Sequence, residues 1–324
     1  MCDSGDGNWS WTRDRNSHLG VKSAYVDSDF RSRTMMKIQR TLLTILLFVT
    51  YPAMTDMAAH AETLPGATRE SVQQQSDRAA NGANDPDVMY LTGLMFDRGE
   101  GVPQDYKEAF RWYVLAAEAG QPGAMNSLGL MYALGHGVTQ DHSEAVKWWT
   151  KAADNGSRAA LGNIATTYYT GLGVQKSYPE AAKWFQLAAD KGDEDAMNML
   201  GVMYAQGFGV TRDRRNAIKL FEQSSYLGCS SAMVNLGTLY AGGRGVKRDN
   251  ALAYAWLIAS LAFSVPAEIH DATVYQLGMI AARLDPNQLT RAERFARKIA
   301  VTIVSHQARE PDRKSDQARL GPMI

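Results

Sequence analysis

The side chains able to carry acid–base or metal chemistry are few and widely spaced in this sequence. Of the six histidines, His136 and His142 stand closest together, six positions apart. That spacing by itself fixes no metal geometry, and neither a cysteine nor a third histidine accompanies the pair. His270 and His306 lie near no serine or cysteine nucleophile motif. We therefore expect no catalytic residue, no metal site and no cofactor.

The two cysteines, Cys2 and Cys229, are too few for a disulfide framework or for a zinc site built from cysteine pairs. Cys229 follows Gly228 at a turn, and we interpret it as a packed thiol rather than a nucleophile. Glycine runs such as residues 242–245 could suggest a phosphate loop, but they lack a preceding strand and a closing Gly-Lys-Ser/Thr. We interpret them as turns of a repeat.

The charge balance argues against one class of partner. The 324 residues include 34 Lys and Arg against 34 Asp and Glu, so the formal net charge is 0. Without a basic surplus to neutralise phosphates, general nucleic-acid binding is not expected. Hydrophobic residues make up 45% of the chain, which is enough apolar material for a folded core.

From Asp85 onward the sequence repeats every 36 residues, which indicates a stacked array of similar units. Five copies follow one another without insertion. We expect two aromatic series in this register to be structural. They are Phe96, Tyr132, Tyr168, Tyr204 and Tyr240, and Trp112, Trp148, Trp184 and Trp256 with Leu220 in the fourth copy.

Within each copy the apolar residues recur at three- and four-residue steps, which predicts two helices per unit. In the second copy, the first helix ends at Gly135 and the second opens at Asp141. Asp141 and Glu144 form the pattern of a capping box, and Gly156 stands where a left-handed residue closes a helix.

No unit can bury its apolar face alone, so we expect an all-α fold, an α/α superhelical solenoid with a concave and a convex face. We expect the tryptophan series to fill the gaps between units. Trp148→Ala should then cost more stability than Trp149→Ala, because Trp149 lies outside the register. Small residues on the first helices should let helices cross closely: Gly129, Ala165, Gly201 and Gly237.

The concave face is the candidate binding site, because the first helices of successive units line up there. Amides and short apolar groups suit an extended peptide, whose backbone they can hydrogen-bond and whose side chains they can cover. The alternative for each asparagine is that it satisfies a neighbouring helix backbone. The candidate partner-binding residues are Asn126, Leu130, Asn163, Thr166, Tyr169, Asn198, Val202, Gln206, Asn235 and Thr238.

Residues 124–156 read A-x-x-x-L-G-x-x-Y-x-x-G-x-G-V-x-x-D-x-x-x-A-x-x-W-x-x-x-A-A-x-x-G. This pattern resembles the Sel-one-like repeat family, a relative of the tetratricopeptide repeats, in five copies over residues 85–263. The resemblance implies an α/α solenoid used as a protein-binding scaffold. The chain departs from the pattern at Ala165 in place of glycine and at Leu220 in place of tryptophan.

After Phe263 the period fades, but two longer helical patterns predict a C-terminal cap over residues 264–304. Ser264 can cap the first helix, with Pro266 in its first turn, and the second begins at Asp285 and Pro286. Residues 305–324 are expected to form a flexible tail. The two apolar faces are Ile269, Thr273, Leu277, Ile280 and Leu284, and Ala292, Phe295, Ala296, Ile299 and Ile303.

The N-terminal part carries the order of a secretory signal peptide over residues 35–61. Lys37 and Arg40 precede the apolar residues 41–49, and Ala59 and Ala61 form the cleavage pattern. The apolar run is too short for a membrane span of about 20 residues. We interpret residues 1–34 as an extension before the true start and residues 62–84 as a polar linker.

These observations predict an exported protein, periplasmic rather than secreted or anchored, that binds a protein or peptide in its concave groove as an adaptor or regulator. Two alternatives stay open. Cysteine-rich members of the same family are associated with binding or weakly hydrolysing β-lactams, which would imply a cell-wall ligand, but this chain lacks their cysteine pairs. The second alternative is a secreted factor that binds host proteins.

We predict that the exported protein begins at Glu62, because the small residues of the cleavage pattern end at Ala61. N-terminal sequencing of the protein recovered from the cell envelope measures this directly. A recovered chain that still carries residues 42–49 would show an anchor instead.

Overall fold

The computed structural model describes residues 85–263 and 267–309. In these ranges it contains twelve helices and no strand, so the predicted all-α solenoid is confirmed. The predicted extension, signal peptide and linker, the cap at Ser264 and residues 310–324 lie outside the described residues.

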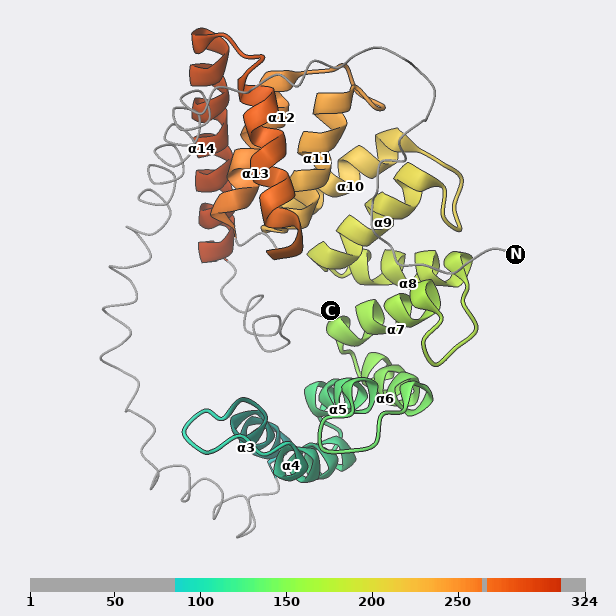
Figure 1. The fold of residues 1–324 in the computed structure, drawn as a ribbon. Helices are drawn as coiled ribbons and strands as arrows, with labels where there is room; N and C mark the ends of the chain where they lie inside the picture. The colour runs from blue at the N-terminus through green and yellow to red at the C-terminus, as the bar shows by residue number, and fades with distance from the viewer. Residues whose placement is uncertain (1–84, 264–266, 310–324) are drawn as a thin grey trace, which may run out of the picture.

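Two antiparallel helices form each of the five units, and a sixth helix pair follows them. Successive units stack into a curved array, which runs from α3 and α4 at one end to α13 and α14 at the other (Figure 1). The helices are α3 (Pro86–Arg98), α4 (Tyr106–Glu118), α5 (Pro122–Leu134), α6 (His142–Asp154), α7 (Arg158–Thr170), α8 (Tyr178–Asp190), α9 (Glu194–Gln206), α10 (Arg214–Leu227), α11 (Ser230–Gly242), α12 (Asn250–Ala262), α13 (Ala267–Ala281) and α14 (Pro286–Arg309).

The second helix of each unit begins at a capping side chain, as predicted. The Asp141 carboxylate accepts hydrogen bonds from the backbone N–H groups of Ser143 and Glu144 at 2.9 and 3.0 Å. The reciprocal half of the capping box is replaced, because the Asp141 N–H donates to the Tyr132 carbonyl and the Glu144 carboxylate pairs with Lys147. The cap therefore also ties the second helix to the end of the first.

The paired glycines of each turn serve two different purposes. Gly135 ends α5 with a φ of 73°, a left-handed conformation that glycine adopts without steric cost. Gly137 has a φ of 72° and lies so close to the Tyr106 carbonyl of the preceding unit that a Cβ would collide with it. The second glycine thus lets consecutive units approach through their backbones.

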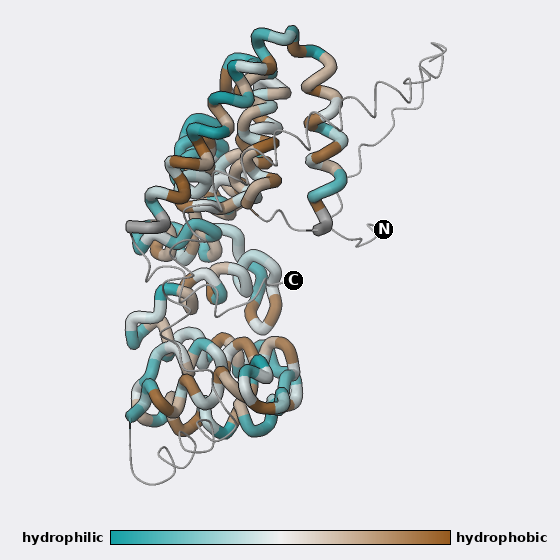
Figure 2. Tube along the Cα trace, turned by 90° about the vertical axis from the view of Figure 1, so that its left-hand side faces the viewer, coloured by the Kyte–Doolittle hydropathy of each residue, from teal (hydrophilic) through white to brown (hydrophobic). Residues whose placement is uncertain are grey.

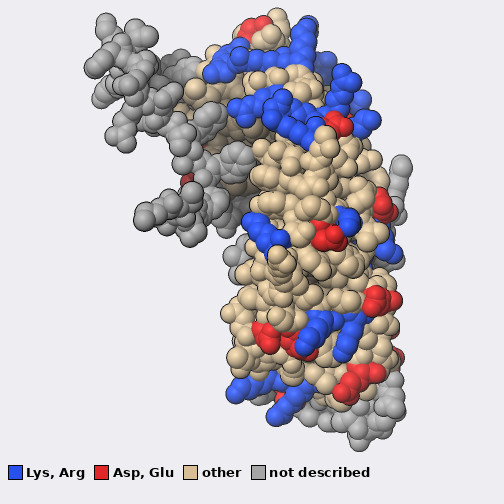
Figure 3. Space-filling view, turned by 90° about the vertical axis from the view of Figure 1, so that its right-hand side faces the viewer, with Lys and Arg blue, Asp and Glu red and all other residues tan. Residues whose placement is uncertain are grey.

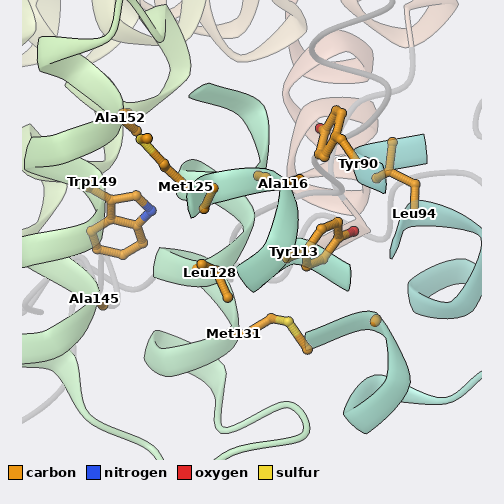
Figure 4. Packing of buried hydrophobic residues seen from close by; sticks show 14 of the residues in the cluster. Tyr90, Leu94, Tyr113, Ala116, Met125, Leu128, Met131, Ala145, Trp149 and Ala152 are labelled. Carbon is orange, nitrogen blue, oxygen red and sulfur yellow. The ribbon is translucent and has the colours of Figure 1, made fainter. Parts of the chain in front are cut away.

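The expectation that Trp148 is the buried member of its pair is wrong. Trp149 is 3% exposed, whereas Trp148 is half-buried and packs at the edge of the same apolar cluster. Figure 4 shows the Trp149 indole on the side of α6 that faces Met125 and Leu128 of α5. The tryptophans of the series pack against the apolar clusters, but in every unit the adjacent residue is the deeper one. Even Trp256, which is 3% exposed, is followed by Leu257 at 0%.

The deeper residue faces the small residue of the first helix, as predicted for a close helix crossing. A Cβ added to Gly129 would strike the Trp149 indole, and one added to Gly201 would lie 2.7 Å from the Phe221 ring. The first helix therefore presents bare backbone where the second helix presents its bulkiest group. The large residues of this register are Tyr113, Trp149, Phe185, Phe221 and Leu257.

The last two helices cap the array. In α13, Thr273, Leu277 and Ile280 are buried, as predicted. Helix α14 packs against α12 and α10, and its Phe295 ring meets Trp256 edge-on at 6.5 Å. Ala292, Ala296, Ile299 and Ile303 of α14 are buried, whereas its other side is polar.

Hydrophilic and hydrophobic stretches alternate along α14, as expected of a helix with one face on the core (Figure 2). The helix continues to Arg309, beyond residue 304, the predicted end of the cap. Among the residues that the structure describes, no helix has both the length and the apolar character needed to cross a bilayer.

We predict that Trp149→Ala lowers the free energy of unfolding by about 3–5 kcal/mol, because it empties a buried site between α5 and α6. Denaturant unfolding of the protein, followed by circular dichroism, measures this. Trp148→Ala is the matched control and should cost clearly less, because its side chain is only half-buried. Equal losses for the two variants would contradict the packing described above.

Candidate binding surface

In Figure 1, α5 lies on the inner side of the curved array relative to α6, and the other first helices hold the same place in their units of the repeat. All ten predicted partner-binding residues lie on these helices. Asn126 and Leu130 are on α5, Asn163, Thr166 and Tyr169 on α7, Asn198, Val202 and Gln206 on α9, and Asn235 and Thr238 on α11.

Four of these residues share one position of the repeat and form a row across the units, here called the concave strip: Leu130, Thr166, Val202 and Thr238. The first three are half-buried and Thr238 is exposed. The Thr166 hydroxyl donates to the Gly162 carbonyl of its own helix, so this residue presents mainly its methyl group outward. The strip is a mildly apolar surface.

The concave strip extends onto the cap. The hydroxyl of Thr238 and the carboxamide of Gln276 lie 3.4 Å apart, and this contact joins α11 to α13. One residue that sequence reasoning missed lies beside the strip. Leu134 is 44% exposed and occupies the same position of the repeat as Gln206, so the period itself could have found it.

The asparagines are arranged differently from the strip, because they bond to one another. The Asn163 side-chain amide donates to the Asn126 carboxamide oxygen at 2.9 Å, and Asn235 donates to Asn198 at 2.8 Å. Asn126, Asn163 and Asn198 are buried. Each bond joins the first helices of two consecutive units, α5 to α7 and α9 to α11.

These pairs act first as links between units. A carboxamide left without a partner in a buried position carries a desolvation penalty, and the pairing removes part of it. The Trp149 indole N–H donates to the Asn126 backbone carbonyl at 3.2 Å, so the first pair also rests on the buried tryptophan. In each pair, one hydrogen of the donating side-chain amide and one lone pair of the accepting oxygen are used. The remaining amide hydrogens and oxygen lone pairs can make further hydrogen bonds.

Tyr169 belongs to the packing inside its own unit. Its ring meets Tyr178 edge-on at 5.2 Å and Phe185 at 6.5 Å. Burial raises the pKa of its hydroxyl. Gln206 is exposed at the end of α9. The predicted set thus divides into the concave strip, the asparagine pairs and single residues at the helix ends.

The groups considered first for chemistry have structural surroundings. Cys229 is buried at the start of α11, its thiol lies 3.5 Å from an Asp195 carboxylate oxygen, and burial raises its pKa to about 12. A thiol that stays protonated at neutral pH is a poor nucleophile. The His136 ring stacks on Tyr106 at 4.3 Å. Within residues 85–263 and 267–309, no three His, Cys, Asp or Glu side chains gather as metal ligands.

The Sel1 repeat signature matches residues 86–121, 122–157, 158–193, 194–229 and 230–260, which together make up more than half of the chain. The protein belongs to the Sel1 repeat family. The resemblance inferred from the glycine and aromatic spacing is therefore confirmed. Sel1-repeat proteins generally act as scaffolds for protein–protein interaction.

Two solved structures of Sel1-like proteins are similar to this one. A Sel1 repeat protein from Oxalobacter formigenes is 37% identical with a TM-score of 0.57, and the match covers 67% of this chain and 89% of that one. A protective antigen present in uropathogenic Escherichia coli strains is 26% identical with a TM-score of 0.59, over 90% of this chain and 58% of that one. No curated protein sequence matches the chain.

We predict that Asn163→Ala destabilises the protein by about 1–2 kcal/mol, because it leaves the buried Asn126 carboxamide without this donor. Asn126→Ala and the double variant complete a cycle, in which the double loss should fall short of the sum by about 0.5–1.5 kcal/mol. Asn155→Ala, at an exposed helix end, serves as the control. Strict additivity in denaturant unfolding would show that the pair contributes nothing as a pair.

Proposed function

We propose that this protein is an exported Sel1-repeat scaffold that holds an extended segment of a protein partner along its concave strip, as an adaptor or regulator in the cell envelope. The observation that carries the proposal is the strip itself. It presents one partly exposed side chain from each of four consecutive units, Leu130, Thr166, Val202 and Thr238.

The spacing of the strip suits an extended peptide. Asparagine side chains bridge the first helices of consecutive units, α5 to α7 and α9 to α11, so consecutive strip residues recur at intervals on the order of 10 Å, about one interhelical distance. An extended chain rises by about 3.3 Å per residue, so every third residue of a bound peptide would meet a unit. Asn235, the one asparagine of the two pairs that is only half-buried, can offer its remaining amide hydrogen to the peptide backbone.

The proposed place in the cell envelope is supported by the signal-like order of residues 35–61. A secreted protein that binds host proteins would use the same surface. The E. coli relative is described as a protective antigen, and this description keeps the second role open as the alternative.

A β-lactam-directed activity is the third possibility. It has less support, because the described residues contain one cysteine, Cys229, and its thiol is buried. Turnover of a β-lactam by the protein above the rate without protein would contradict the adaptor function.

Site-specific photo-crosslinking tests the proposed site. We predict that a photoreactive residue placed at Thr166 or Val202 crosslinks the partner in the cell envelope, because both positions face it. The same residue at Lys147 or Lys183, exposed on the second helices α6 and α8, should give no such product. Crosslinks from the second helices with none from the strip would contradict the site.

A further inference from the structure

The loops and the first two turns of the second helices in the fourth and fifth units carry a dense group of basic side chains, here called the basic edge. All are exposed except Arg214, which is half-buried. Figure 3 faces the loops that join α9 to α10 and α11 to α12, and shows Lys and Arg gathered toward the end of the molecule where these units lie. The basic edge comprises Arg212, Arg214, Arg215, Lys219, Arg244, Lys247 and Arg248.

The repeat shows that most of this charge is a departure from the pattern of the other units. The exception is Lys219, whose position is also basic in the first three units, as Arg111, Lys147 and Lys183. The first three units carry a glutamate in the first turn of the second helix, and Asn216 and Leu252 replace it in the fourth and fifth. Basic residues appear at loop positions that are uncharged or acidic in the first two units. The replaced glutamates are Glu108, Glu144 and Glu180.

At the position of Arg212, the side chain braces the turn between the two helices, and this role does not require a charge. The Gln104 and Gln140 side-chain amides donate to the carbonyls of Asp97 and Ala133, seven residues earlier, and so brace the turn. Arg212 makes the equivalent bond from its Nε to the Ala205 carbonyl at 3.1 Å. A glutamine suffices for this brace, so the terminal guanidinium nitrogens of Arg212 are additional to it.

A second position places two like charges where other units stack rings. The residue between the paired glycines packs on the first residue of the preceding unit's second helix, as His136 does on Tyr106 at 4.3 Å and Phe208 on Tyr178 at 5.0 Å. In the fifth unit the corresponding residues are Arg244 and Arg214. The Arg214 side chain lies against Gly245, next to Arg244.

These charges are not neutralised within the part of the chain that the structure describes, where no ion pair involves any residue of the basic edge. Two carboxylates lie among them, but both cap helices. Asp213 accepts from the backbone N–H groups of Arg215 and Asn216, and Asp249 from those of Ala251 and Leu252. The helix N-termini are thereby occupied, so the attraction for an anion comes from the side chains.

We propose that the basic edge is a second docking surface, which binds a short acidic segment of a protein partner. Its charges are spread over two neighbouring loops, which suits carboxylates spaced along a chain better than one compact anion. The preceding units carry glutamates at the same edge, and each is paired with a basic residue three positions on, so these units offer no basic surplus to an anionic membrane or a nucleic acid long enough to span several units. An acidic segment of about six to eight residues is long enough to cover the two basic loops and too short to reach the glutamates of the preceding units.

Binding of a fluorescein-labelled oligoglutamate of about ten residues to the full chain, measured by anisotropy at low salt, tests the proposal. The test variant takes residues that other units use at the same positions: Arg212→Gln, Arg214→Tyr, Arg244→Leu and Arg248→Gln. Its affinity should fall about tenfold or more, because four positive charges are removed, three of them exposed and one half-buried. Its thermal midpoint should not fall, because each new residue already serves in another unit.

The matched control removes the same number of charges from the first three units by the same rule: Lys107→Ser, Lys151→Gln, Lys183→Ala and Lys191→Asn. Its affinity should change by less than about twofold. Equal losses for the two variants would overturn the proposal. So would binding of anionic lipid vesicles or single-stranded DNA, but not of oligoglutamate, in a manner that depends on the basic edge.

If the fourfold variant loses helicity, Arg212→Gln with Arg248→Gln replaces it, because Gln104 and Gln140 show that glutamine fits this position. This pair should still weaken oligoglutamate binding by about threefold. Unchanged binding would overturn the proposal. The result is independent of the concave strip, which none of these substitutions touches.

Discussion

The whole array depends on how closely the two helices of a unit can approach. At Gly129 the first helix offers bare backbone, and the Trp149 indole of the second helix fills the space that a Cβ would take. The fourth unit repeats the arrangement with Gly201 and Phe221. Close packing of this kind leaves no room for a larger side chain on the first helix. The curvature of the stack and the faces it exposes follow from it.

A second close approach, between units, sets the edge of the solenoid. Gly137 lies against the Tyr106 carbonyl and Gly173 against that of His142, so each turn sits on the start of the preceding unit's second helix. The residue between the glycines is then held over that helix start. The His136 ring stacked on Tyr106 and the Arg244 side chain beside Arg214 therefore occupy equivalent places in their units. The rings pack on each other, whereas the two arginines place like charges together.

The sequence predicted the period, the helix pairs, the N-caps and the left-handed glycines, because each depends on local backbone chemistry that the spacing displays. It selected the wrong member of the Trp148 and Trp149 pair as the buried one, because adjacent aromatic residues both fit a three- and four-residue pattern. The asparagine pairs were missed because the partners lie 37 rather than 36 residues apart. The net charge of 0 hid the basic edge, since a sum over the chain contains no information on where charges gather.

The central claim is that the inner face formed by the first helices binds the partner while the second helices support them. Hydrogen–deuterium exchange of the protein, alone and in complex with the partner recovered by crosslinking, tests it most directly. We expect slower exchange in α5, α7, α9 and α11 on binding, with little change in α6 and α8. Protection confined to the second helices, with the first helices unchanged, would contradict it.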